Sequence, residues 1–174
     1  MMRALTVILA ALFTAAALGW QQAGPTAVSG GPHNPSPRFE AVDVFVDSGA
    51  RPLGAWQVEI KAIFGNTGGA TVPRSVKLVG IEGGEAAAYK QPPYYDPAAL
   101  HESQIQERIV LAAFSTDVQG AGLPTGKTRV ARLHVQVTGG AGEPEYVVKL
   151  MTAGAADGSR IDAKATTAPA GDRR

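Results

Sequence analysis

The chain has 174 residues and no cysteine, and its 16 basic and 15 acidic residues leave a formal net charge of +1. This near balance excludes the basic stripe that binds nucleic acid and the polybasic segment that binds anionic lipid, so neither is an expected partner. Because cysteine is absent, neither a disulfide nor a lipid-bearing cysteine is possible, and a hydrophobic core must stabilise the fold.

Residues 1–19 have the pattern of a signal peptide. A positive charge at Arg3 precedes an apolar run, and small residues follow that run. Cleavage is expected near Gly19, with Ala23 as the alternative. An uncleaved anchor is the competing interpretation, but the apolar run of residues 4–18 is shorter than the ~20 residues that span a bilayer. We therefore expect a secreted protein, extracellular or periplasmic, with no membrane insertion after signal cleavage.

The rest of the chain suits one β-rich domain. Residues 20–37 are rich in Gly and Pro and are expected to form a linker, residues 38–165 to form the domain, and residues 166–174 to form a disordered tail. Short runs that alternate apolar and polar residues, or are apolar throughout, predict strands. These runs are residues 39–47, 55–64, 74–81, 109–115, 128–138, 146–151 and 160–165. Turn residues separate them and no long segment has a helical period, so the fold class predicted is all-β, an antiparallel β-sandwich.

The alternation within these runs assigns their faces. Leu133 is predicted to be buried and Arg132 to lie in water. Trp56 is in phase with the apolar residues of its run and is predicted to lie in the core. The run 109–115 is apolar on both faces, which predicts a central strand or one covered by a loop.

The segment 84–107 is too long for an ordinary hairpin connection. Within it, Asp96 followed by Pro97 predicts the start of a short helix with Asp96 as its N-cap. Tyr95 and Leu100 stand at the positions that clasp in a hydrophobic staple. We therefore expect one long loop with a short helix, which either carries the function or covers the edge of the core.

No assembled catalytic motif is present. The GKT sequence at Lys127 enters a predicted strand and lacks the first glycine of a P-loop, and the His-Glu pair at His101 lacks the second histidine of a zinc protease. We expect no cofactor and no metal: Asp43, Asp47 and Asp157 lack calcium-loop spacing. The chain is predicted not to be an enzyme. The alternative is a secreted glycoside hydrolase-type enzyme that uses two of the acids in or beside the long loop, which are Glu82, Glu85, Asp96, Glu102 and Glu107.

Five residues are candidates for ligand binding. Tyr94 and Tyr95 follow two prolines and offer flat apolar faces with a hydroxyl group to a sugar or a peptide, and Asp96 can hold them in place through its cap. The alternative for both tyrosines is packing within the loop. Phe45 and Ile63 point to the polar faces of their strands, where an outward apolar residue marks a protein interface or lies beneath the loop.

Several of these runs resemble the cohesin modules of secreted bacterial polysaccharide-degrading systems. The likeness lies in residues 42–46, 53–60, 108–115, 128–137 and 156–161. It implies a cohesin-like β-sandwich of jelly-roll type that binds a partner without catalysis. In cohesins a Tyr-Asp-Pro segment follows the second strand directly, whereas here Tyr95, Asp96 and Pro97 come beyond an additional strand.

These patterns predict a secreted, non-enzymatic binding module that attaches to an extracellular protein, including a dockerin-like one, or to a polysaccharide. A protein would bind a flat sheet face, with Phe45 and Ile63. The alternative is a carbohydrate-binding module that uses Tyr94 and Tyr95.

The signal-peptide prediction has a direct test. Because the apolar run ends just before Gly19, the exported protein should begin between about residues 19 and 24. Intact-mass analysis of the protein recovered from the extracellular or periplasmic fraction measures this start. Recovery of the full-length chain from membranes would show an anchor instead.

Overall fold

The computed structural model describes residues 36–65, 73–105, 108–116, 120–139 and 142–171. The predicted signal peptide, most of the predicted linker and the last residues of the predicted tail lie outside them. In this described part, the chain forms seven strands and three single turns of 3₁₀ helix, and no α-helix.

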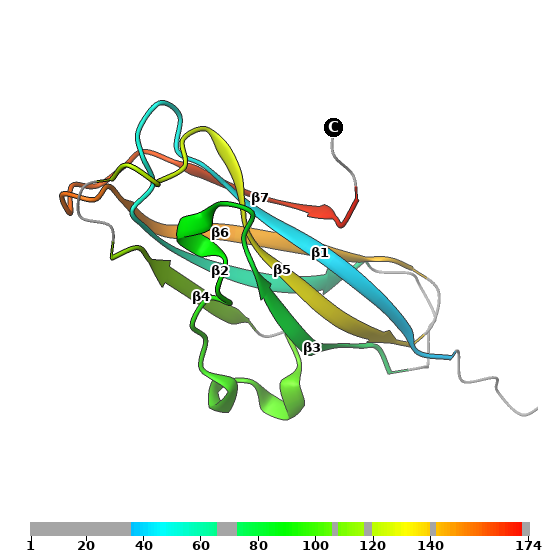
Figure 1. Cartoon of the computed structure of the whole chain (residues 1–174). Coiled ribbons are helices and arrows are strands. Elements are labelled where there is room, and N and C mark those ends of the chain that lie inside the picture. The colour runs from blue at the N-terminus through cyan, green and yellow to red at the C-terminus, as the bar shows by residue number, and fades with distance from the viewer. Residues whose placement is uncertain (1–35, 66–72, 106–107, 117–119, 140–141, 172–174) are drawn as a thin grey trace, which may run out of the picture. The chain divides into compact units, whose positions relative to one another are not determined.

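The strands form two antiparallel sheets. In chain order they are β1 (Arg38–Asp47), β2 (Ala55–Phe64), β3 (Ser75–Gly83), β4 (Ile109–Phe114), β5 (Lys127–Thr138), β6 (Pro144–Gly154) and β7 (Lys164–Pro169). Sheet A has the order β3-β5-β1-β7, and sheet B has the order β4-β2-β6. The two sheets lie as two layers (Figure 1), and every paired neighbour is antiparallel. This confirms the predicted all-β antiparallel class.

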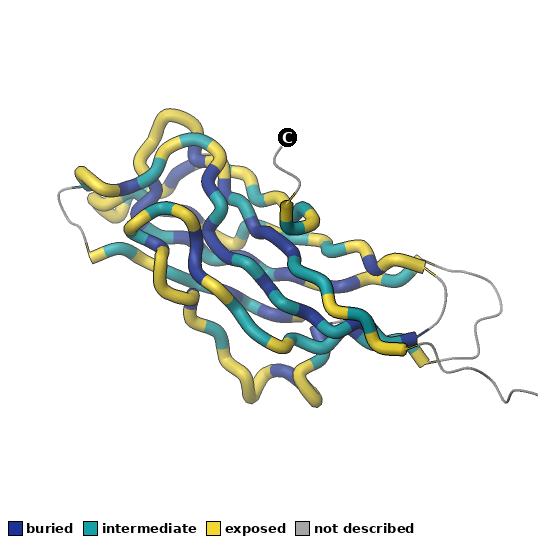
Figure 2. The backbone as a smooth tube through the Cα atoms, turned by 45° about the vertical axis from the view of Figure 1, so that its right-hand side comes forward, coloured by how far each residue is buried: buried dark blue, intermediate teal, exposed yellow. Residues whose placement is uncertain are grey.

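The core lies between the two sheets. Leu133 of β5 is fully buried as predicted, and it belongs to an alternating buried series that runs through Ala131, Leu133, Val135 and Val137. Trp56 of β2 is also buried, as its phase predicts. Figure 2 shows these buried stretches along the middle of the strands, with exposed residues gathered in the turns. The largest fully buried side chains come from both sheets and from the connections, and include Trp56, Leu53, Ile60, Ile105, Leu111 and Leu133.

The last strand begins later than the sequence predicts. The run 160–165 is predicted as a strand, but β7 is Lys164–Pro169, so residues 166–169 of the predicted tail pair with β1. Arg160 forms only an isolated bridge with Gly154, and the Ile161 N–H donates to the Ala153 carbonyl over 2.9 Å. Residues 160–163 are therefore used to cross from sheet B to sheet A, and the strand starts after that crossing.

Arg132 lies on the outer face of its strand, as the alternation predicts, but its side chain is engaged in an ion pair. Arg132 lies opposite Asp43 on the outer face of sheet A, and its Nε donates to Asp43 Oδ1 over 2.6 Å. A second bond joins its terminal nitrogen to Oδ2 over 3.0 Å, and Arg129 lies 3.9 Å from the same carboxylate. Asp43 is only 6% exposed. Arg132 is therefore not simply in water, because it neutralises a buried acid.

We predict that Arg132→Ala lowers the free energy of unfolding by about 1–3 kcal/mol. Breaking a fully buried pair costs about 3–5 kcal/mol, and Arg129 remains near Asp43 to offset part of that loss. Arg108→Ala is the control: the Arg108 side chain is 64% exposed and Lys61 also lies near Glu59, so the loss should be less than about 0.5 kcal/mol. Urea titration of both variants measures the difference, and equal losses would contradict a stabilising role for the Asp43 pair.

Candidate functional site

The loop between β3 and β4 closes one side of the sandwich. It contains three 3₁₀ turns, η1 (Ala87–Tyr89), η2 (Pro97–Ala99) and η3 (His101–Ser103), in place of the predicted short helix. The predicted cap is confirmed: Asp96 Oδ1 accepts a hydrogen bond from the Ala98 N–H over 2.9 Å, with Pro97 at the first position.

Main-chain hydrogen bonds from this loop reach both sheets. The Ile105 N–H donates to the Val76 carbonyl of β3 over 3.0 Å, and the Ile105 carbonyl accepts from the Ala62 N–H of β2 over 3.1 Å. Tyr94 and Ala112 of β4 exchange two further bonds, of 2.8 and 3.0 Å. In Figure 1 the loop follows the side on which β3 and β4 lie. The loop thus supplies main-chain hydrogen-bond partners to the outer edges of β3 and β4.

Tyr89 anchors the first part of the loop. Its ring is buried and meets Trp56 edge to face, with the ring centroids 6.2 Å apart. Its hydroxyl donates to the Leu53 carbonyl, and burial raises the pKa of that hydroxyl. This bond and the ring contact hold Tyr89 in the core at the start of the loop.

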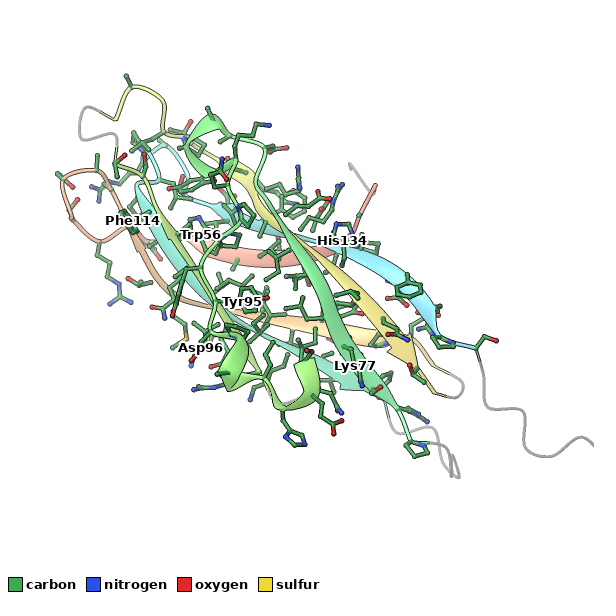
Figure 3. The ribbon with its side chains drawn as sticks, turned by 60° about the horizontal axis from the view of Figure 1, so that its bottom comes forward. Trp56, Lys77, Tyr95, Asp96, Phe114 and His134 are labelled. Atoms are coloured by element: carbon green, nitrogen blue, oxygen red, sulfur yellow. The ribbon has the colours of Figure 1, made fainter. Side chains whose placement is uncertain are left out.

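These contacts place two exposed aromatic rings on one face. Tyr94 lies opposite Ala112 and Phe114 is two residues further along β4, so both side chains point to the outer face of sheet B. Tyr94 is 75% exposed and Phe114 is 74% exposed. Figure 3 shows Phe114 at one end of β4 and Asp96 toward the other end.

The two rings border an open groove of about 510 Å³. Pro92 and Pro93 form part of one wall, and Gln57 of β2 and Thr152 of β6 add polar groups. None of the described residues that line this groove is charged. Glu59, the next outward residue of β2, is paired with Arg108 and Lys61. The groove is therefore a neutral surface with aromatic, amide and hydroxyl groups.

A larger cleft of about 810 Å³ lies near β1, β6 and β7. Three of its four charged lining residues are paired: Arg38 contacts Glu40 over 2.6 Å and Glu143 over 2.7 Å. The Tyr146 hydroxyl donates to Glu40 over 3.1 Å, and burial raises its pKa. Most charged groups of this cleft pair with one another, whereas the groove bordered by Tyr94 and Phe114 (the Tyr94 groove) presents two exposed aromatic rings, so the Tyr94 groove is the stronger candidate site.

The five predicted ligand residues are not brought together. Tyr94 lines the groove, whereas Tyr95 is partly buried against the core and Asp96 caps a turn. Phe45 lies on the outer face of sheet A, where the Lys127 ammonium sits 4.8 Å from its ring centroid. Ile63 is 46% exposed at the far end of β2.

Phe114 is the residue that sequence reasoning missed. The run around Phe114 is apolar on both faces, so no alternation with polar residues indicates which of its side chains point outward. β4 is an edge strand of sheet B, so the predicted central position is wrong. The loop pairs with the outer edge of β4 at Ala112, as the alternative of a loop-covered strand predicts, but it leaves the outer face exposed at Phe114. The missed signal is the phase of Phe114, which differs from that of Ile109 and Leu111.

The titratable residues are dispersed. Glu82 lies 2.8 Å from His134 Nε2 on the outer face of sheet A, and Glu85 accepts from the Arg129 N–H. Asp96 caps η2, and Glu102 lies in η3. Glu107 lies outside the described residues. Among the described residues, no group of three or more His, Asp or Glu side chains is placed to hold a metal ion.

Comparison with known proteins gives no relative: no family model, no curated protein and no solved structure matches this chain. None of the helical turns in the described parts of the chain has the length and the apolar composition of a membrane-spanning helix.

The two adjacent tyrosines should separate in their effect on stability. Tyr94→Ala should change the free energy of unfolding by less than about 0.5 kcal/mol, because its ring is exposed. Tyr95→Ala should cost more, about 1–3 kcal/mol, because its ring packs against the core. Urea titration measures both, and a larger loss for Tyr94 would show that the loop packs differently.

Proposed function

We propose that this protein is a secreted, non-enzymatic binding module with a cohesin-like jelly-roll sandwich. The Tyr94 groove holds its ligand, which is an extracellular protein or a polysaccharide. The observation that carries this proposal is the pair of exposed rings, Tyr94 and Phe114, on one neutral groove. Exposed aromatic rings on a rigid frame are typical anchors of binding surfaces.

The frame around the rings favours binding. Two main-chain bonds hold Tyr94 to β4, two prolines precede it, and Phe114 belongs to a strand. A main chain that is fixed before the ligand arrives loses little conformational entropy on binding. The fixed main chain at both rings supports this groove as a binding site.

The arrangement of acids does not favour glycosidase chemistry at this groove. That chemistry needs two carboxyl groups on either side of the scissile bond. No described residue that lines the groove is an acid. Glu82 and Asp96 have other partners, His134 and the Ala98 N–H.

A protein partner on the face of sheet B is the second candidate. Ile63, Val147 and Met151 are exposed apolar residues of β2 and β6. Val147 lies opposite Lys61, beside Ile63, on the outer face of the sheet. An apolar sheet face of this kind favours a protein partner, including a dockerin-like one.

Capture from the native extracellular fraction tests the site. A Tyr94→Ala, Phe114→Ala double variant should retain at least about tenfold less protein or carbohydrate than the natural sequence, because both anchors are removed. Phe39→Ala is the matched control, since Phe39 is 71% exposed but belongs to β1 of sheet A. Equal capture by the double variant would overturn the groove as the site. If an Ile63→Ser, Val147→Ser variant alone lost capture, the sheet face would replace it.

A further inference from the structure

We infer that the groove binds a neutral polysaccharide chain through side chains. This inference rests on the proposed function, because it names the ligand of the same groove. It depends on three features: the occupied edge of β4, the ring faces with their polar neighbours, and the absence of charge among the described lining residues.

The first feature argues against an added peptide strand. A peptide that extends a sheet needs free main-chain groups along an edge. β4 has only the residues Ile109–Phe114, and the N–H and carbonyl groups of Ala112, near its middle, are bonded to Tyr94. An added strand would have to displace Tyr94. The ligand is therefore recognised mainly by side chains.

The second feature is the chemistry of those side chains. Tyr94 and Phe114 present apolar rings, while Gln57 and Thr152 lie on the same outer face of sheet B. Gln57 is opposite both Ala112 and Thr152, so the polar groups lie in the row that begins at Tyr94. A sugar has an apolar ring face and hydroxyl groups at its rim, which match a stacking ring beside an amide and a hydroxyl.

The positions of the two rings favour a chain over a single sugar. Tyr94 and Phe114 are diagonal neighbours across the β4 edge, a relation that separates residues by about 7–8 Å. Small residues, Ala112 and Ala55, lie between and beside them in the groove. Two sugar units of one chain can each stack on a ring across this interval.

The third feature concerns charge. A site for an acidic polysaccharide or a phosphate would present Arg or Lys. The described lining residues include neither, and Arg108 and Lys61 are engaged with Glu59. The groove therefore matches a ligand without charge.

Calorimetry with defined oligosaccharides tests this inference. The probes are neutral hexaoses of glucose, mannose, xylose and galactose, with hexagalacturonate as the acidic comparison and glucose as the single-sugar comparison. At least one neutral hexaose should bind, and hexagalacturonate and glucose should bind at least about tenfold more weakly. Tyr94→Ala and Phe114→Ala should each weaken the binding by about tenfold, and Phe39→Ala should leave it unchanged. Phe114→Trp should retain it, because an aromatic face is kept.

The results distinguish the ligand from the site. If no neutral hexaose binds but capture of a protein from the extracellular fraction still depends on Tyr94 and Phe114, the polysaccharide inference is overturned and the proposed groove stands with a protein ligand. If capture does not depend on these rings, the proposed function itself fails. Tighter binding of hexagalacturonate would contradict the inference that the ligand is uncharged. Equal binding of glucose and a neutral hexaose would contradict the inference that the ligand is a polysaccharide chain.

Discussion

The burial of Tyr89 against Trp56 is the contact on which the groove depends. Tyr89 joins the start of the loop to the core of sheet B, and its hydroxyl satisfies the Leu53 carbonyl. Leaving the buried Tyr89 hydroxyl without a hydrogen-bond partner would destabilise the fold, so the bond to Leu53 favours one position of the ring within the core. The position of Tyr89 therefore sets where the next loop residues, up to Tyr94, begin.

The loop pairs with the edges of the sandwich, which would otherwise be exposed. An exposed edge strand offers its main-chain groups to other chains. Here Ile105 bonds to β3 and β2, and Tyr94 bonds to β4, so the loop satisfies edges of both sheets. The same bonds that protect β4 hold the Tyr94 ring outward. Protection of the edge and presentation of the ring thus have one structural cause.

The outer faces of the two sheets differ in character. Sheet A carries linked charges, with Arg132 bound to the buried Asp43 and His134 beside Glu82. Sheet B carries the neutral groove and, further along, exposed apolar residues such as Ile63. On sheet A the exposed Phe39 ring lies on β1, whereas on sheet B two exposed rings, Tyr94 and Phe114, border one groove.

The sequence alone determined most of the strands and the faces of those that alternate, because alternation depends only on local geometry: Leu133 and Trp56 are buried as their phase predicts, and Asp96 caps a turn as its neighbour Pro97 predicts. It placed the last strand too early and did not assign a face to Phe114. It did not determine which residues meet across strands. The pairing of Arg132 with Asp43, and of Tyr94 with Ala112, depends on register between distant segments. Only the tertiary structure therefore decided that Phe114 joins Tyr94 in one groove, because the phase of a residue assigns its face, while strand order and register assign its neighbours.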